Sequence, residues 1–235
     1  MEYRISDDIF NAFPNFRRGV VVGKNINNLE VHPELGQSLA TEAAVVSSDQ
    51  EKLDDPRLIA WDQAYLSFGV NPRRDTPSIR FLVSQIAKGR PPRPINDVVN
   101  IFNILSLRYR MPCGGDDLDA LRGENILLDF AKGDETFAAL FSPEKIEKPA
   151  AGEVVYLARP SNRIMCRRWN WRNADFSRIR PETTNVAVNL DGLVPPISNS
   201  DLEDAVAALG ELLRKFCGGT ISTYVLNRDN PRIEV

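Results

Sequence analysis

The chain contains 235 residues, with 29 lysines and arginines against 32 aspartates and glutamates, so its formal net charge is −3. This balance excludes a globally basic nucleic-acid coat protein, and 43% hydrophobic residues are enough for an ordinary globular core. The sequence has no apolar run of about 18 residues and no basic, apolar start typical of a signal peptide. We therefore expect a cytoplasmic protein with no membrane partner.

The first half of the sequence predicts a strand followed by four helices. The run from Gly19 to Gly23 is apolar and β-branched, as expected of a buried strand. Helix starts are indicated by Asp54 or Asp55 before Pro56 and by Asn96 after a proline-rich linker. The helices are expected over residues 33–50, 54–68, 76–89 and 96–111.

From residue 124 onward, short apolar runs alternate with turns, which is typical of strands. The last helix is marked by a capping box at Ser200 and Glu203, an apolar stripe from Leu202 to Phe216, and Gly218 after its end. Strands are expected in one sheet over residues 126–130, 136–141, 153–158, 163–166 and 185–190, with a final strand over 220–226. We predict an α+β fold, a mixed β-sheet packed with helices, in one domain over residues 1–235.

The usual catalytic and cofactor-binding signatures are missing: the sequence has no Walker loop, no G-x-G-x-x-G and no G-x-S-x-G. A catalytic triad would need the one histidine, His32, which precedes a proline and is interpreted as an incidental loop residue. The three cysteines are widely spaced and form no C-x-x-C pair. We therefore expect reduced, unreactive thiols, no metal site and no cofactor.

The segment from Asn162 to Arg180 is strongly basic in a mildly acidic protein. It holds six arginines and one aspartate, with Trp169, Trp171 and Phe176 between them. Guanidinium groups beside aromatic rings suit phosphates and unpaired bases. Alternatively, the tryptophans face a core while the arginines pair with acidic side chains. Spacing does not separate the two interpretations.

Two polar segments in the middle of the chain are unusual. Residues 111–118 combine two glycines, which let a backbone approach a ligand, with two acids that alternatively cap a turn. Asn96, Asn100 and Asn103 are spaced to share one face of a helix, where asparagine is intrinsically unfavourable. These asparagines therefore either border a polar pocket or hold a neighbouring loop.

Several short segments occur in a characteristic order: Trp61, then FGVNP (68–72), RPINDVVNIFN (93–103), SLRYRMPCGGDDL (106–118), GEVVY (152–156) and CRRWNWR (166–172). In this order they resemble the B3/B4 domain of the phenylalanyl-tRNA synthetase β subunit, and more closely free-standing proteins made of that domain. The resemblance covers roughly residues 56–190, leaving an N-terminal extension over 1–55 and a C-terminal helix and strand over 198–226. It implies the same mixed sheet packed with helices.

In the synthetase, that domain hydrolyses tyrosine wrongly esterified to the phenylalanine tRNA. The pocket of this chain departs from the pattern, because Gly114 stands where the synthetase has a histidine and Asn100 where it has an aspartate. Asn189 falls near a glutamate that contacts the tyrosine hydroxyl, and residues 167–171 replace a glycine-rich loop. The resemblance thus implies the fold without the tyrosine specificity.

The resemblance implies a tRNA-binding protein that deacylates misacylated aminoacyl-tRNA, an enzyme of the ester hydrolase class. An activated ester needs little more than an oriented water and backbone donors for the oxyanion, roles expected of Gly114 and Gly115. The residues expected to bind substrate are Asn100, Asn103, Asp117, Trp169 and Asn189. Those expected at the RNA acceptor end are Arg167, Arg168 and Arg172.

Two alternatives stay open. In the first, the chain is a non-catalytic module that binds a free amino acid or small metabolite, and its arginines recognise carboxylate or phosphate. In the second, the arginines pair with acidic residues inside the molecule, and the protein acts through a protein partner. A concave pocket beside a positive surface favours the hydrolase, whereas internally paired arginines favour the second alternative. No DNA partner is expected.

Overall fold

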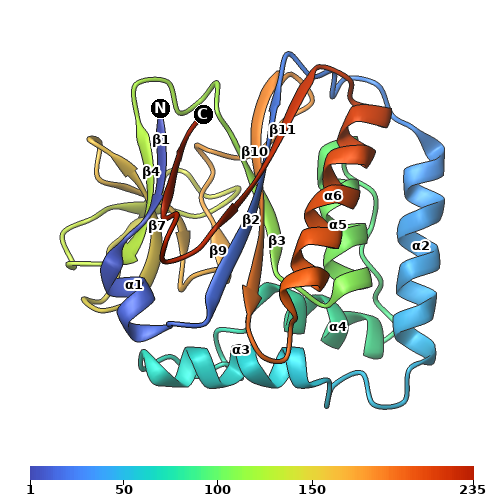
Figure 1. Ribbon diagram of the computed structural model, residues 1–235, viewed down its shortest axis with the longest axis horizontal. Helices are drawn as coiled ribbons and strands as arrows, with labels where there is room; N and C mark the ends of the chain where they lie inside the picture. The colour runs from blue at the N-terminus through green and yellow to red at the C-terminus, as the bar shows by residue number, and fades with distance from the viewer.

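The computed structural model describes residues 1–235 as six helices and two main β-sheets, with a further pair of short strands (Figure 1). The helices are α1 (Asp7–Ala12), α2 (Pro33–Ser48), α3 (Pro56–Ser67), α4 (Ser78–Ala87), α5 (Asp97–Tyr109) and α6 (Asn199–Phe216). The strands are β1 (Glu2–Ile5), β2 (Phe16–Lys24), β3 (Cys113–Asp117), β4 (Asn125–Phe130), β5 (Phe137–Ala138), β6 (Ile146–Glu147), β7 (Val154–Arg159), β8 (Arg163–Arg167), β9 (Arg172–Asn173), β10 (Asn185–Leu193), β11 (Thr220–Leu226) and β12 (Arg232–Glu234). The fold is α+β, which confirms the predicted fold class.

The strands form two main sheets, so the prediction of one sheet was wrong. The larger sheet has the order β12-β1-β4-β7-β8-β9 and the smaller one β11-β2-β10-β3, while β5 pairs with β6. Apolar patterns identify strands but carry no information about their partners. The N-terminal strand β2 pairs with β10 along its whole length, from Lys24 opposite Asn185 to Phe16 opposite Leu193. Residues before Pro56 therefore supply a central strand of the smaller sheet.

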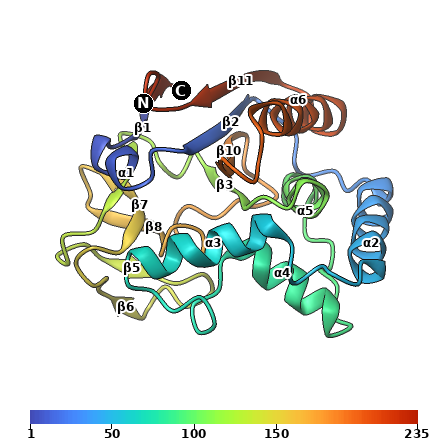
Figure 2. The same ribbon diagram turned by 60° about the horizontal axis from the view of Figure 1, so that its bottom comes forward.

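The smaller sheet lies between the larger sheet and a layer of helices (Figures 1 and 2). Helices α5 and α6 pack on its outer face, and α2 packs against α5. The contact between α6 and β2 requires glycine at position 19, because a Cβ there would lie 2.1 Å from Val206 Cγ2. Strand β10 is covered on both faces, so its residues from Val186 to Gly192 are all buried.

One contiguous core of 49 buried residues takes side chains from all six helices and from both main sheets. Trp61 and Trp169 are its largest members, and their ring centroids lie 5.0 Å apart. A separate cluster of seven residues, including Val155 and Leu157, covers the opposite face of the larger sheet. None of the six helices combines the length and apolar character that crossing a membrane requires.

The helices from α2 to α5 lie within two residues of their predicted ends, and β11 has its predicted bounds. Two local predictions were wrong. Ser198 rather than Ser200 caps α6, and Asp201 completes the capping box in place of Glu203. Residues 113–117 form a strand rather than a turn, because they pair with β10, although Asp117 does cap the turn that follows, its Oδ1 accepting from Asp119 N at 2.8 Å and from Ala120 N at 3.1 Å. The short elements β1, α1 and β12 were missed, since they carry no clear apolar period.

Candidate functional site

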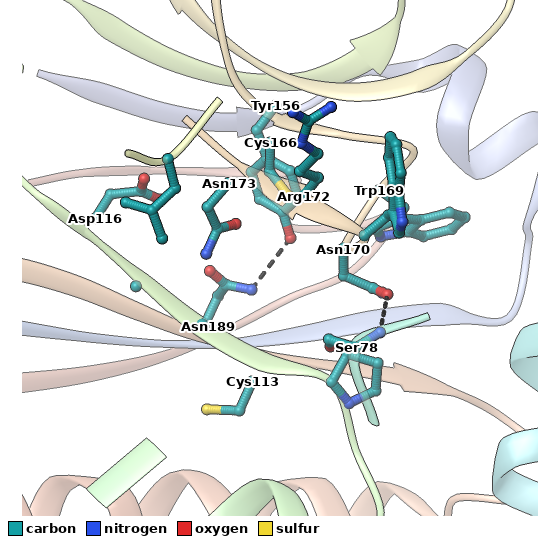
Figure 3. Close-up of a pocket in the computed structure, with 15 residues that line it drawn as sticks. Ser78, Cys113, Asp116, Tyr156, Cys166, Trp169, Asn170, Arg172, Asn173 and Asn189 are labelled. Carbon is teal, nitrogen blue, oxygen red and sulfur yellow. Dashed lines mark hydrogen bonds between the residues drawn. The ribbon is translucent and has the colours of Figure 1, made fainter. Parts of the chain in front are cut away.

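A cavity of about 310 Å³ lies where the edge of the smaller sheet faces the larger sheet, and we term it the first chamber (Figure 3). Strands β3 and β10 bound it on one side, and β7, the β8–β9 turn and the start of α4 bound it on the others. The lining residues are Ser78, Pro112, Cys113, Gly114, Gly115, Asp116, Leu140, Tyr156, Cys166, Trp169, Asn170, Trp171, Arg172, Asn173 and Asn189. An apolar lining with a few convergent polar groups is typical of small-molecule sites.

A second chamber of about 680 Å³ adjoins the first, because Gly115, Asp116, Leu140 and Asn173 line both. Its other walls come from the start of α5 and from residues 177–182, which follow β9. The side chain of Phe141 stands at its edge and is 78% exposed. The two chambers therefore meet at these four shared residues.

Two glycines of β3 shape the wall of this site differently. Gly114 lies opposite Asn189 in the antiparallel ladder, and a Cβ at this position would meet no atom within 4 Å. Glycine at 114 therefore keeps the first chamber open without being needed for packing. At Gly115, by contrast, a Cβ would lie 2.9 Å from Ile179 Cδ1 and 3.1 Å from the backbone oxygen of Ala187, so a side chain there would be crowded against β10.

Strand β3 is the edge of its sheet, which leaves alternate backbone groups without a ladder partner. At one end of the ladder, Leu118 N donates to Asn185 O at 2.9 Å. Alternation from this bond directs the N–H of Gly114 toward β10 and leaves the N–H of Gly115 on the open edge, in the wall of both chambers. Of the two glycines, Gly115 is the one with a backbone donor free for a ligand.

A buried charged network behind the first chamber joins the two sheets. The side chain of Arg18 is fully buried, and its Nε donates to Asp191 Oδ1 at 2.7 Å. The hydroxyl of Tyr156 donates to Asp191 Oδ2 at 3.0 Å and accepts from Asn189 Nδ2 at 3.1 Å. Arg18 also donates to the hydroxyls of Tyr156 and Tyr3. The amide of Asn189 thus borders the chamber while this network holds it (Figure 3).

Asp116 is the acidic residue at the junction of the two chambers. Burial raises the pKa of its carboxyl from 3.8 to about 7; a hydrogen bond with Ser177 and the charge of Arg18 oppose the rise, and Asp117 adds to it. Such a carboxyl is about half ionised near neutral pH, the range that suits general acid–base catalysis. The sequence shows two adjacent acids, but only the strand register determines which one faces the chambers.

The structure brings together some of the predicted catalytic and substrate-binding residues and not others. Those that line the first chamber are Gly114, Gly115, Trp169 and Asn189. Asn103 lines the second chamber instead. Asn100 lines neither, because its Oδ1 accepts from Ile95 N at 2.8 Å and holds the linker before α5. Asp117 also lies outside both chambers, with its Oδ2 accepting from the hydroxyl of Thr183 at 2.6 Å.

Arg167 and Arg172, two of the three arginines predicted to contact RNA, are paired inside the molecule. Both guanidinium groups contact the carboxylate of Glu147, at 2.9 Å and 3.1 Å respectively. Arg167 is buried, which on its own would lower its pKa, but its contacts with Glu153, at 2.5 Å, and with Glu147 outweigh burial and raise the pKa. Their charges are therefore compensated within the larger sheet.

Arg168, the third of these arginines, pairs with the buried carboxylate of Asp75 at 2.6 Å. Its guanidinium group also lies 4.5 Å from the ring centroid of Trp171, which is a cation–π contact. All three predicted RNA contacts thus interact within the chain. This arrangement favours the alternative in which the basic segment forms internal ion pairs.

His32 and Cys217 lie outside both chambers, whereas Cys113 and Cys166 line the first chamber. His32 Nδ1 lies 2.5 Å from Oδ2 of the buried Asp97, which ties the start of α2 to the start of α5, so the interpretation as an incidental loop residue was wrong. Burial raises the pKa of the Cys113 thiol well above its ordinary value. That thiol is therefore protonated and a poor nucleophile.

Residues 60–218 match the family model of the B3/4 domain. Among solved structures, the chain is similar to an N-terminal fragment of the phenylalanyl-tRNA synthetase β-subunit from Pyrococcus horikoshii, with 14% identity and a TM-score of 0.43. The match covers 93% of this chain and 49% of that one, so the chain spans about half the length of that structure. No curated protein matches the chain. Because the family model matches more than half of the residues, the chain belongs to the B3/4 domain family, which its motifs resemble.

Proposed function

We propose that the chain binds the 3′ end of a misacylated tRNA and hydrolyses its aminoacyl ester. The observation that carries the proposal is Asp116, a carboxyl with a pKa of about 7 placed where the two chambers meet. An ester held across that junction has its amino acid in the first chamber and its ribose in the second. The membership of the B3/4 domain family agrees with the tRNA-linked substrate that the motif resemblance implies.

Asp116 is the general base in this proposal. Its carboxylate accepts a proton from a water molecule as the oxygen of that water attacks the ester carbonyl carbon. The bond between the carbonyl carbon and the ribose oxygen then breaks, and the proton on Asp116 passes to the departing oxygen. The free N–H of Gly115 donates to the oxyanion that forms in between. No side-chain nucleophile is needed, because the ester is already activated.

The second chamber is the place for the terminal nucleotide. Phe141 is exposed at its edge, and the guanidinium group of Arg178 lies 5.5 Å from the centre of its ring. Arg178 and Arg180 share one carboxylate, that of Asp175, and both remain partly exposed. Exposed aromatic rings stack on unpaired bases, and guanidinium groups bind phosphates. These residues replace the predicted RNA contacts, whose guanidinium groups are paired with Glu147, Glu153 and Asp75.

The test is deacylation of a panel of mischarged and correctly charged tRNAs by the purified protein. We expect selective hydrolysis of one mischarged species, with kcat/KM rising as pH increases through about 7, where Asp116 ionises. Asp116→Asn should lower the rate by about 10² to 10⁴-fold. Asp204→Asn is the matched control, because Asp204 is exposed on α6, away from both chambers.

A second variant tests the site without touching the base. Gly114→Phe should fill the first chamber, and the open space around a Cβ at this position means that the backbone need not move. The variant should fold and lose deacylation. Hydrolysis at an unchanged rate in both Asp116→Asn and Gly114→Phe would contradict the proposal.

A binding module for a free amino acid or small metabolite is the second candidate function. The first chamber favours it, because a cavity of about 310 Å³ with a few convergent polar groups suits a small molecule, while the internal pairing of Arg167, Arg168 and Arg172 leaves no cluster of free arginines beside it to hold RNA. This candidate predicts background deacylation rates together with saturable binding of a free amino acid, and Gly114→Phe should abolish that binding.

A further inference from the structure

One wall of the first chamber carries polar atoms that no group of the chain satisfies. Ser78 begins α4, while Trp169 and Asn170 lie in the turn between β8 and β9, and all three line the chamber (Figure 3). Eight buried side-chain atoms of the chain have no hydrogen-bond partner, and three of them, Ser78 Oγ, Trp169 Nε1 and Asn170 Nδ2, belong to residues that line this chamber. Buried polar groups in proteins nearly always have partners, so three exceptions in one wall indicate a missing ligand.

The orientation of the Asn170 amide follows from its contacts. Its Oδ1 accepts from the hydroxyl of Tyr65 at 2.9 Å and from Ser78 N at 3.2 Å. Both partners are donors in these contacts, so the oxygen must be the atom that faces them and Nδ2 is the end left without a partner. Tyr65 is fully buried, which fixes the amide in place.

The turn that presents these groups is strained and strongly held. Arg168 and Trp169 have φ values of 48° and 65°, a left-handed conformation that non-glycine residues seldom adopt. The Trp169 ring packs edge-on against Phe13 and Trp61, with centroid distances of 4.7 and 5.0 Å. The ion pair of Arg168 with Asp75 holds the other side of the turn. Strain of this kind persists where surrounding contacts impose it, often at ligand sites.

The chemistry of the wall selects its ligand. An indole N–H and an amide NH₂ only donate, and the serine hydroxyl can donate as well. The nearby cations, Arg168 and Arg172, are already paired with carboxylates; Arg168 Nε has no hydrogen-bond partner, but Arg168 does not line the chamber, so no free charge faces the ligand. A cluster of neutral donors suits an uncharged oxygen acceptor better than a carboxylate, whose charge would stay uncompensated.

We propose that this wall binds the side-chain oxygen of the amino acid to be removed, and that the substrates are esters of small, uncharged, polar amino acids with a hydroxyl or carboxamide group. The inference rests on the proposed function for the ester and adds the class of amino acid. An apolar side chain of the same shape leaves the three donors desolvated and unpaired. Sites of this design reject such isosteres, and we expect a preference of roughly tenfold or more.

Binding of non-hydrolysable analogues tests the inference separately from hydrolysis. The probes are adenosines that carry threonine, valine, asparagine or leucine through a 3′-amide bond, titrated by calorimetry into the full chain. We expect the threonine analogue to bind at least about ten times more tightly than its isostere valine, or the asparagine analogue than leucine, and the pair that responds identifies the group as hydroxyl or carboxamide.

Ser78→Ala provides the matched variant. It removes a hydroxyl that has no partner in the chain, so thermal unfolding should be unchanged. The variant should weaken the preferred polar analogue several-fold and leave its apolar isostere unaffected. Ser84→Ala is the control, because Ser84 lies on the same helix but lines neither chamber.

The two proposals fail in different ways. Selective binding without hydrolysis of any ester would contradict the proposed function and would support the inference that this wall binds a side-chain oxygen. Equal affinities for polar and apolar analogues, an unchanged preference in Ser78→Ala, or no binding of any analogue would overturn the inference about the wall.

Discussion

Two polar regions border the first chamber, and they differ in how completely the chain satisfies them. In the inter-sheet network, Arg18, Asp191 and Tyr156 hydrogen-bond to one another and are fully or almost fully buried. In the wall formed by Ser78, Trp169 and Asn170, which we term the donor wall, each residue leaves a buried polar atom without a partner. A completed network stabilises one arrangement of the two sheets, whereas unpaired donors cost stability until a ligand arrives. The difference separates a structural role from a binding role on opposite sides of one cavity.

The largest expected effect comes from breaking the completed network. Asp191→Ala leaves the guanidinium group of Arg18 buried and unpaired, and we expect a loss of about 3–5 kcal/mol in the free energy of unfolding. Denaturant titration measures this loss. The double variant Arg18→Met, Asp191→Leu removes both charges and should be clearly more stable than Asp191→Ala. Equal losses in the two variants would show that the network is not a closed unit.

The second prediction concerns pH and the stability cost of the site. Because the pKa of Asp116 is raised to about 7 in the folded chain, the fold holds a proton between about pH 4 and pH 7 that the unfolded chain releases. Stability is therefore highest below this window and falls as pH rises through it, by up to about 4 kcal/mol. Asp116→Asn should be more stable than the parent at pH 8 in denaturant titrations, while its activity is lost. Equal stability at that pH would argue against burial as the cause of the shift.

The third prediction extends the comparison to the second chamber, where Phe141 is exposed instead of packed. Phe141→Ala should weaken binding of an RNA with a single-stranded 3′ end by about 1–3 kcal/mol, the contribution of one stacked base. Fluorescence titration provides the measurement. Phe81→Ala is the control, because Phe81 is also exposed but lies on α4 outside both chambers. Similar losses in the two variants would remove the case for a stacking platform.

The fourth prediction compares a paired arginine with a partly free one. Arg180→Ala should reduce the slope of log K against log salt by about 0.7, the value for one lost contact to a single strand. Arg172→Ala should leave the slope unchanged, since this guanidinium group is engaged by Glu147. The reverse result would restore the basic segment 162–180 as the RNA contact.

The smallest effect is expected at His32. The hydrogen bond with Asp97 raises the pKa of His32 above 6.5, with smaller contributions from the charges of Asp97, Glu34 and Glu30. The stabilisation is therefore complete below about pH 6.5 and is lost as pH rises through the raised value. His32→Gln should flatten this part of the pH dependence of unfolding. An unchanged pH profile would show that the contact contributes nothing to stability.

The sequence predicts much of the fold because its helices carry local signals. Asp55 and Asn96 cap α3 and α5 as expected, since a cap acts on residues two or three positions away. Sheet assignment depends on contacts between distant segments, such as β2 with β10, for which the sequence has no local signal. The glycine-rich strand β3 lacks the apolar alternation that marks strands, so the sequence did not predict that these residues form a strand.

The candidate site was predictable in part for the same reason. Gly114, Trp169 and Asn189 were identified through motif resemblance, and they line the first chamber together. Asp116 was missed because the choice between two adjacent acids depends on the register of β3. The arginines of residues 167–172 were assigned to RNA because the sequence does not show that carboxylates such as Glu153 and Asp75 lie next to them.

The first and last strands lie side by side, which has a consequence for engineering the chain (Figure 1). Val235 N donates to Met1 O at 2.9 Å, so a short peptide can join the two ends without moving either strand. A circularly permuted version can then be opened in an exposed loop, such as residues 143–145 between β5 and β6. The same geometry lets the whole fold be inserted into a surface loop of another protein, entering and leaving at one point.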